Sequence, residues 1–111
     1  MSDLFIFRRY KKRQGRKKAR HPKLIVDESG GEYGFMGLTS SERKGKRHNN
    51  IELKKNPQFE NGKRLKGKSY LRKKIEYDEK RRFGKALKDY RLSDEDRTFL
   101  IGYVKKRKKK R

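Results

Sequence analysis

Residues 24–38 read Leu-Ile-Val-Asp-Glu-Ser-Gly-Gly-Glu-Tyr-Gly-Phe-Met-Gly-Leu, and this stretch decides the fold. Two apolar runs flank the turn-forming cluster Ser29-Gly30-Gly31, and the first run is β-branched. This pattern predicts a β-hairpin with its turn at Gly30-Gly31. Gly34 and Gly37 interrupt the second run, and glycines inside a strand are typical of bulges and of the bends of small barrels.

Short apolar segments predict further strands at Leu4–Phe7, at Ile51–Leu53 and around Tyr70, Leu71 and Ile75. Phe83, Leu87 and Tyr90 have helical spacing, although Gly84 interrupts them. The expected fold class is mainly β (α+β): a small barrel or a curled sheet with one helix laid on it.

The C-terminal segment predicts the clearest helix. Ser93 is a natural N-cap, and the acidic residues 94–96 place negative charge at the positive end of the helix dipole. Helix capping fully explains the presence of these three acids. The predicted apolar face of this helix comprises Phe99, Leu100, Tyr103 and Val104. We expect the other aromatic residues Tyr33, Phe35 and Tyr70 in the core as well.

Charge is concentrated at the two ends of the chain. The 111 residues include 37 Lys or Arg against 14 Asp or Glu, a net charge of +23. Residues 1–23 hold ten basic residues and one acid, and 105–111 are all basic, whereas 24–104 hold twenty basic and thirteen acidic residues. This predicts an N-terminal strand and basic arm (1–23, with the arm at Arg8–Arg20), a fold with a C-terminal helix (24–104) and a basic tail (105–111).

Such an excess of positive charge indicates a polyanionic partner, and nucleic acid above all, because neutralising phosphates releases condensed counterions. An acidic protein partner fits the same charge. The chain has no cysteine, which excludes disulfides and thiolate metal sites, and we expect no metal and no other cofactor. No apolar run reaches the roughly 20 residues of a membrane helix, so we expect a cytoplasmic protein without a membrane partner.

The side chains expected to contact nucleic acid fall in the arm and in the polar loop after the hairpin. They are Arg8, Arg9, Lys11, Lys12, Arg13, Arg16, Lys17 and Lys18 in the arm, and Arg43, Lys44, Lys46, Arg47 and His48 in the loop. We also expect Tyr10 to be exposed and able to stack on a base, because its neighbours are charged.

The hairpin also predicts a candidate catalytic site. The start of its first strand lies beside the end of its second, so Arg20 and His21 are expected near Thr39 and Ser40. A general base, a guanidinium and hydroxyl donors are what cleavage of RNA by its own 2′-hydroxyl requires, without a metal. The simpler interpretation is a solvated His21 and an ordinary turn after Thr39.

Three segments in order are similar to the MazF/PemK-like toxin family. They are Arg20-His21-Pro22-Lys23-Leu24-Ile25-Val26, then Gly37-Leu38-Thr39-Ser40, then His48-Asn49-Asn50-Ile51-Glu52-Leu53. The family shows an Arg-Pro before an apolar strand, an apolar-Thr-Ser strand end, and a short strand of the form His-x-x-Leu. Tyr90–Asp96 also resembles the family's closing segment, so the resemblance spans about residues 20–104.

This resemblance implies an SH3-like barrel with a C-terminal helix, a homodimer, and metal-independent cleavage of single-stranded RNA, which favours RNA over DNA as the partner. The family's catalytic Arg falls on His21, with Arg20 one position earlier, and its catalytic Thr or Ser falls on Thr39 or Ser40. The chain departs from the family in carrying a basic arm where the family has a Gly-Asp-apolar strand.

Two other functional classes remain open. One is a non-enzymatic RNA- or DNA-binding module, including an inactive relative that holds nucleic acid at the same place. The other is a mobile-element-encoded inhibitor of a nucleic-acid-handling enzyme, of the anti-CRISPR kind.

Overall fold

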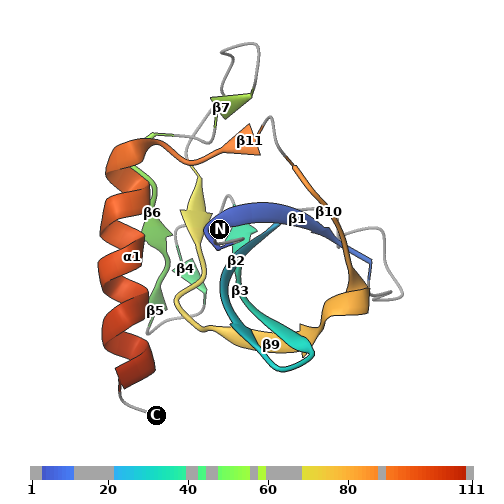
Figure 1. Cartoon of the computed structure of the whole chain (residues 1–111). Helices are drawn as coiled ribbons and strands as arrows, with labels where there is room; N and C mark the ends of the chain where they lie inside the picture. Colours follow the sequence, from blue (N-terminus) through green and yellow to red (C-terminus); the bar gives the residue numbers. More distant parts are fainter. Residues whose placement is uncertain are drawn as a thin grey trace.

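The computed structural model describes residues 4–11, 22–39, 43–44, 48–55, 58–59, 69–87 and 90–109. These form a mainly β chain with a C-terminal helix, as predicted (Figure 1). In chain order the elements are β1 (Ile6–Tyr10), β2 (Lys23–Ser29), β3 (Glu32–Thr39), β4 (Arg43–Lys44), β5 (His48–Asn49), β6 (Ile51–Glu52), β7 (Gln58–Phe59), β8 (Tyr70–Leu71), β9 (Glu76–Glu79), the 3₁₀ turn η1 (Lys80–Arg82), β10 (Phe83–Ala86), β11 (Tyr90–Arg91) and α1 (Asp94–Lys109).

The predicted hairpin is confirmed as β2 and β3. They pair antiparallel from Lys23 opposite Gly37 to Ser29 opposite Glu32, and the register shifts beside Gly34. Gly30 has a φ of 60°, the left-handed conformation that a tight turn needs. At Gly34 a Cβ would lie 2.7 Å from the Tyr77 ring, so the missing side chain lets β9 approach β3.

The main sheet has the order β10-β1-β2-β3-β8-β6, and β9 pairs with the turn end of β3. After β9 the chain passes through η1, and β10 returns to pair with β1, so these strands curve around a common interior (Figure 1). No ladder in the described part of the chain joins β9 to β10, so the hydrogen-bonded sheet is open. The helical spacing of Phe83 and Leu87 was misleading, because Phe83–Ala86 is a strand that pairs with β1.

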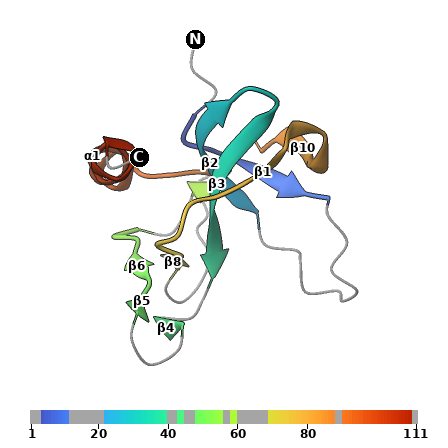
Figure 2. The same ribbon diagram turned by 90° about the horizontal axis from the view of Figure 1, so that it is seen from below.

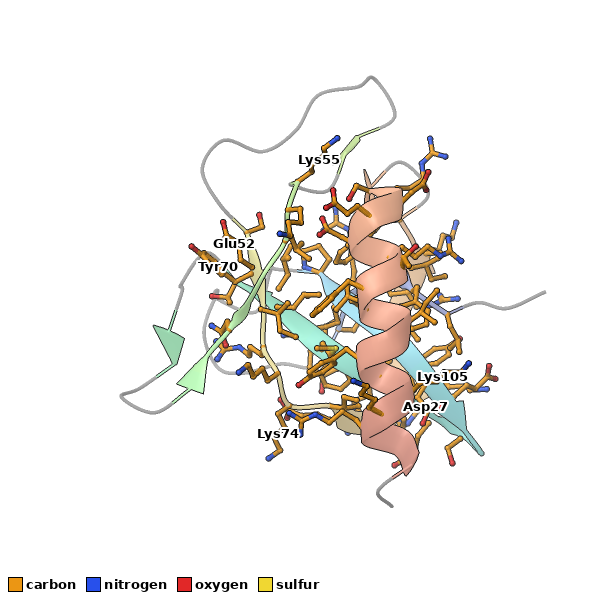
Figure 3. All side chains as sticks on the ribbon, turned by 90° about the vertical axis from the view of Figure 1, so that its left-hand side faces the viewer. Asp27, Glu52, Lys55, Tyr70, Lys74 and Lys105 are labelled. Carbon is orange, nitrogen blue, oxygen red and sulfur yellow. The ribbon has the colours of Figure 1, made fainter. Side chains whose placement is uncertain are left out.

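Successive side chains of a strand point to opposite faces, and both faces of the hairpin are buried because each packs against a separate cluster. One face packs against α1, which lies across β2 and β3 (Figure 3). This cluster comprises Phe7, Leu24, Val26, Met36, Leu38, Leu53, Leu71, Leu100 and Val104. The opposite face carries a smaller cluster that we call the aromatic cluster: Ile25, Phe35 and Phe83, with Leu4, Tyr10 and Tyr33 packed against them.

Helix α1 begins as predicted and buries the predicted face except for Phe99. The amide of Asp96 donates to Ser93 Oγ at 3.2 Å, which confirms the cap. Leu100 and Val104 are buried as expected, whereas Phe99 is 57% exposed, so its predicted place in the core is wrong. No helix in the described residues is long and apolar enough to cross a membrane.

Asp96 does more than cap the helix. Its carboxylate is buried and accepts the backbone amides of Lys54 and Lys55 at 2.7 and 3.1 Å. Figure 3 shows Lys55 near the first turns of the helix, at the exit of β6. The interpretation that capping alone explains residues 94–96 is therefore wrong for Asp96, which also ties α1 to the segment after β6.

Candidate nucleic-acid interface

Two acidic side chains near the turn end of the β2–β3 hairpin have polar partners. Glu28 forms an ion pair with Lys80, and the Tyr77 hydroxyl donates to Asp27 Oδ2 at 2.7 Å. On η1, Arg81 pairs with Glu79 at 3.0 Å. Two acid–base ion pairs, Glu28–Lys80 and Glu79–Arg81, thus lie near this end of the hairpin.

The open end of the hairpin carries cations in a line across the sheet. Arg8 of β1 lies opposite Lys23 of β2, and Lys23 lies opposite Gly37 of β3. On the other side of β3, the amide of Arg72 donates to the carbonyl oxygen of Gly37 at 2.9 Å, which continues the β3–β8 ladder. Because directly opposite residues share a face, the backbone positions of Arg8, Lys23 and Arg72 form a single row interrupted by Gly37. We call these three residues the cation row. The guanidinium of Arg8 extends toward Tyr33, which lies nearer the turn end of the hairpin.

Two members of the cation row rest on the aromatic cluster. Lys23 Nζ lies 5.5 Å from the centre of the Tyr10 ring and 6.0 Å from that of Phe35. The Arg8 guanidinium lies 5.2 Å from the Tyr33 ring centre and donates to the Gly84 carbonyl at 2.7 Å, while its Nε is buried without a hydrogen-bond partner. Ring faces attract cations, and they fix these side chains in place.

The cation row is electrostatically unbalanced. Burial lowers the pKa of Lys23, and the nearby charge of Arg72 lowers it further, whereas Glu76 acts in the opposite direction. Within the described residues, none of the three cations forms an ion pair with a carboxylate. Like charges held together without a counter-ion disfavour folding, and such arrangements cluster at functional sites.

Thr39 lies where the sequence places it. It ends β3, two residues beyond Gly37 and therefore on the same face, and the start of β2 lies beside it as expected. Arg20, His21 and Ser40 fall outside the described residues. The juxtaposition of the two strand ends is confirmed, and the approach of His21 to Thr39 stays a prediction.

The arm begins later than predicted, because Arg8, Arg9 and Tyr10 belong to β1. The expectation that Tyr10 is free to stack on a base is wrong. Its ring packs 5.3 Å from Phe35 and 5.0 Å from Phe83, measured between ring centres, and its hydroxyl donates to Asp78. Burial, together with Asp78, raises the pKa of Tyr10.

Part of the predicted basic loop forms two short paired strands. Arg43 and Lys44 form β4, which pairs with β5 so that Lys44 lies opposite His48. Figure 2 shows the end of β3 pointing toward these two strands. Since only three residues separate Thr39 from Arg43, β4 begins within about 14 Å of the end of β3. Lys11 follows β1 and is exposed, and the other predicted contacts lie outside the described residues: Lys12, Arg13, Arg16, Lys17, Lys18, Lys46 and Arg47.

Lys23 and Arg72 were not predicted from the sequence. Once the turn is placed at Gly30-Gly31, counting back along the hairpin brings Lys23 opposite Gly37, so the signal for Lys23 was present. Arg72 follows only from the pairing of β3 with β8, for which the sequence holds no local signal.

Comparison of the chain with family models, with curated proteins and with solved structures found no match.

Proposed function

We propose that this chain binds nucleic acid through the open end of the β2–β3 hairpin. The observation that carries the proposal is the cation row, which lacks carboxylate partners among the described residues, whereas Lys80 and Arg81 near the turn end are paired with Glu28 and Glu79. Lysine and arginine contacts to the phosphate backbone supply most of the affinity of proteins for nucleic acid. The basic residues of the chain ends add to the net positive charge of the protein.

The proposed architecture is an SH3-like barrel related to the MazF/PemK-like toxins. Two features support it. The strands pair in the order β1, β2, β3 and β9, and after a 3₁₀ turn β10 comes back to β1. The ordered motifs around Pro22 and Thr39 support the same assignment. By this resemblance the preferred ligand is single-stranded RNA.

Binding is tested by fluorescence anisotropy with a labelled single-stranded RNA, comparing the variants R72M and R81M. Arg72 belongs to the cation row, whereas Arg81 is exposed and already paired with Glu79. Loss of one charge-assisted contact, about 1–1.5 kcal/mol, weakens binding roughly tenfold in R72M. R81M is expected to bind within about twofold of the wild type. Equal losses in the two variants would show that binding follows net charge and not this site.

A second candidate function is metal-independent cleavage of the bound RNA. It is supported by the pairing of Lys23 with Gly37, because Thr39 lies two residues beyond Gly37 on β3 and Pro22 directly precedes Lys23. In this reaction a base, proposed to be His21, takes the proton of a 2′-hydroxyl, whose oxygen then attacks the adjacent phosphorus. The bond from phosphorus to the 5′ oxygen breaks, and the leaving oxygen takes up a proton. Arg20 and the hydroxyl of Thr39 or Ser40 are proposed to stabilise charge on the phosphoryl oxygens.

Cleavage is tested by incubating single-stranded RNA with the protein in EDTA. Active protein yields 2′,3′-cyclic phosphate ends, and T39A is expected to lose cleavage while it retains binding. RNA that stays intact with wild-type protein would remove the enzymatic proposal and leave the non-enzymatic binding module.

A further inference from the structure

We propose that Lys23 and Arg72 jointly hold one phosphate group over Gly37, as a defined seat within the interface. The inference deepens the proposed function and rests on it for the identity of the ligand, a phosphodiester of the nucleic-acid backbone. In this proposal Lys23 of β2 and Arg72, directly after β8, bind the same anion.

The two side chains converge on one point. Neighbouring strands lie about 4.8 Å apart, so Lys23 and Arg72, on either side of β3, have backbones separated by roughly twice that distance. Lys23 Nζ and Arg72 Nε nevertheless each lie 3.5 Å from the position that a Cβ on Gly37 would occupy, and hence at most 7 Å from each other. Oxygens of one phosphate, at about 2.8 Å from each nitrogen, can bridge such a pair.

The role of Gly37 in this arrangement is spatial. Gly30 is the glycine with positive φ in the described chain, so the backbone at position 37 does not require glycine. A Cβ there would lie 3.3 Å from Arg72 Cδ and 3.5 Å from Lys23 Nζ. The missing side chain therefore keeps open the space into which both cations reach.

The chemistry of the pair is complementary. The guanidinium of Arg72 offers a planar fork of donors that suits two phosphate oxygens, and the ammonium of Lys23 acts as a compact point charge. Exposed Glu76 is the acid whose charge acts on Lys23, but the two form no ion pair. An anion between Lys23 and Arg72 would relieve their mutual repulsion and the incomplete solvation of Lys23.

The seat is tested by NMR of the full chain with inorganic phosphate, following the side-chain signals of Lys23 and of an exposed control, Lys54. We expect saturable shifts at Lys23, a rise of its pKa when phosphate binds, and no saturable change at Lys54. K23M and R72M should each weaken phosphate binding about tenfold, R72K should restore part of it, and K54M should leave it unchanged. G37A keeps both charges and should weaken binding by obstructing the space between them.

The outcomes separate the seat from the proposed function. If phosphate does not saturate at Lys23 while R72M still weakens RNA binding more than R81M does, the seat is wrong and the proposed interface stands. If wild-type protein binds phosphate at Lys23 but fails to bind RNA, the seat stands as an anion site and the proposed function is overturned. Similar unsaturated shifts at Lys23 and Lys54 would overturn the seat. If a methionine variant does not fold, R72K and G37A replace it in the comparison with wild type, provided that their amide spectra show the native fold.

Discussion

At Lys23, the stability of the fold conflicts with the proposed binding of phosphate. Its ammonium is held between aromatic rings and beside another cation, so the folded protein disfavours the charged form that a phosphate would need. A methionine would fill the same space without this conflict. We therefore expect lysine at position 23 to favour ligand binding at a cost in the stability of the free protein.

The pH dependence of stability tests this view of Lys23. Its pKa is lowered in the folded protein, so between that value and the unfolded value near 10.5 the unfolded chain binds more protons, and the wild type gains stability as pH rises. K23M lacks this gain, and the contribution of Tyr10 is common to both proteins. Urea unfolding from pH 7 to 10.5 should show the advantage of K23M over wild type shrinking with pH. A constant difference across this range would contradict the account.

Tyr10 anchors the aromatic cluster through its hydroxyl. Y10F removes the hydrogen bond to the Asp78 carboxylate, and bonds to charged groups contribute most, so we expect a loss of about 2 kcal/mol in the free energy of unfolding. Y103F is the matched control, because the exposed Tyr103 hydroxyl donates to a neutral carbonyl at 3.2 Å and should contribute only about 0.5 kcal/mol. Denaturant unfolding measures both, and equal losses would show that the Asp78 contact is unimportant.

At the scale of elements, α1 is attached by a polar contact as well as by its apolar face. Asp96 accepts two backbone amides from the segment after β6 and is itself buried. D96N leaves these donors with a weaker acceptor and should cost about 2–3 kcal/mol. D94N alters an exposed acid in the same first turn and should cost less than about 1 kcal/mol, the size of a helix-dipole effect. Chemical denaturation followed by circular dichroism compares the two variants. If D94N and D96N lose the same free energy of unfolding, Asp96 stabilises the helix only through the dipole, and its contacts with the segment after β6 contribute nothing.

Elements defined by local signals were predictable, and those defined by distant pairing were not. The β2–β3 turn and the Ser93 cap follow from residues within a few positions of each other. Phe83 lies in a strand because it pairs with Tyr10, far away in the sequence, and that pairing overrides its helical spacing. The charged neighbours of Tyr10, Arg9 and Lys11, suggest an exposed ring, but Tyr10 lies in β1. In a strand, neighbours point to the opposite face.

The candidate site divides in the same way. Thr39 and the start of β2 could be brought together from the hairpin alone. The cation row needs three pairings at once, since β1 contributes Arg8 and the chain after β8 contributes Arg72. The sequence pattern contains only the first of these contacts, which is why the row emerged from the structure.

Over the whole molecule, the positive charge is unevenly distributed. The ends of the chain hold most of the net charge, whereas residues 24–104 have twenty basic and thirteen acidic residues. In the described part of this middle segment, Lys80 and Arg81 near the turn end of the hairpin form ion pairs, whereas Lys23 and Arg72 at its open end do not. The ends would supply affinity for any phosphate backbone, and the open end of the hairpin would position it.

The salt dependence of binding to single-stranded RNA tests the central claim most directly. Each phosphate neutralised contributes about −0.7 to the slope of log K against log salt, so roughly six contacts give a slope near −4. We predict a slope of this order for wild type, and a slope shallower by roughly 0.7 for R72M but not for R81M. Binding that does not change with salt, or a slope that R72M and R81M alter equally, would contradict a nucleic-acid interface at the open end of the β2–β3 hairpin.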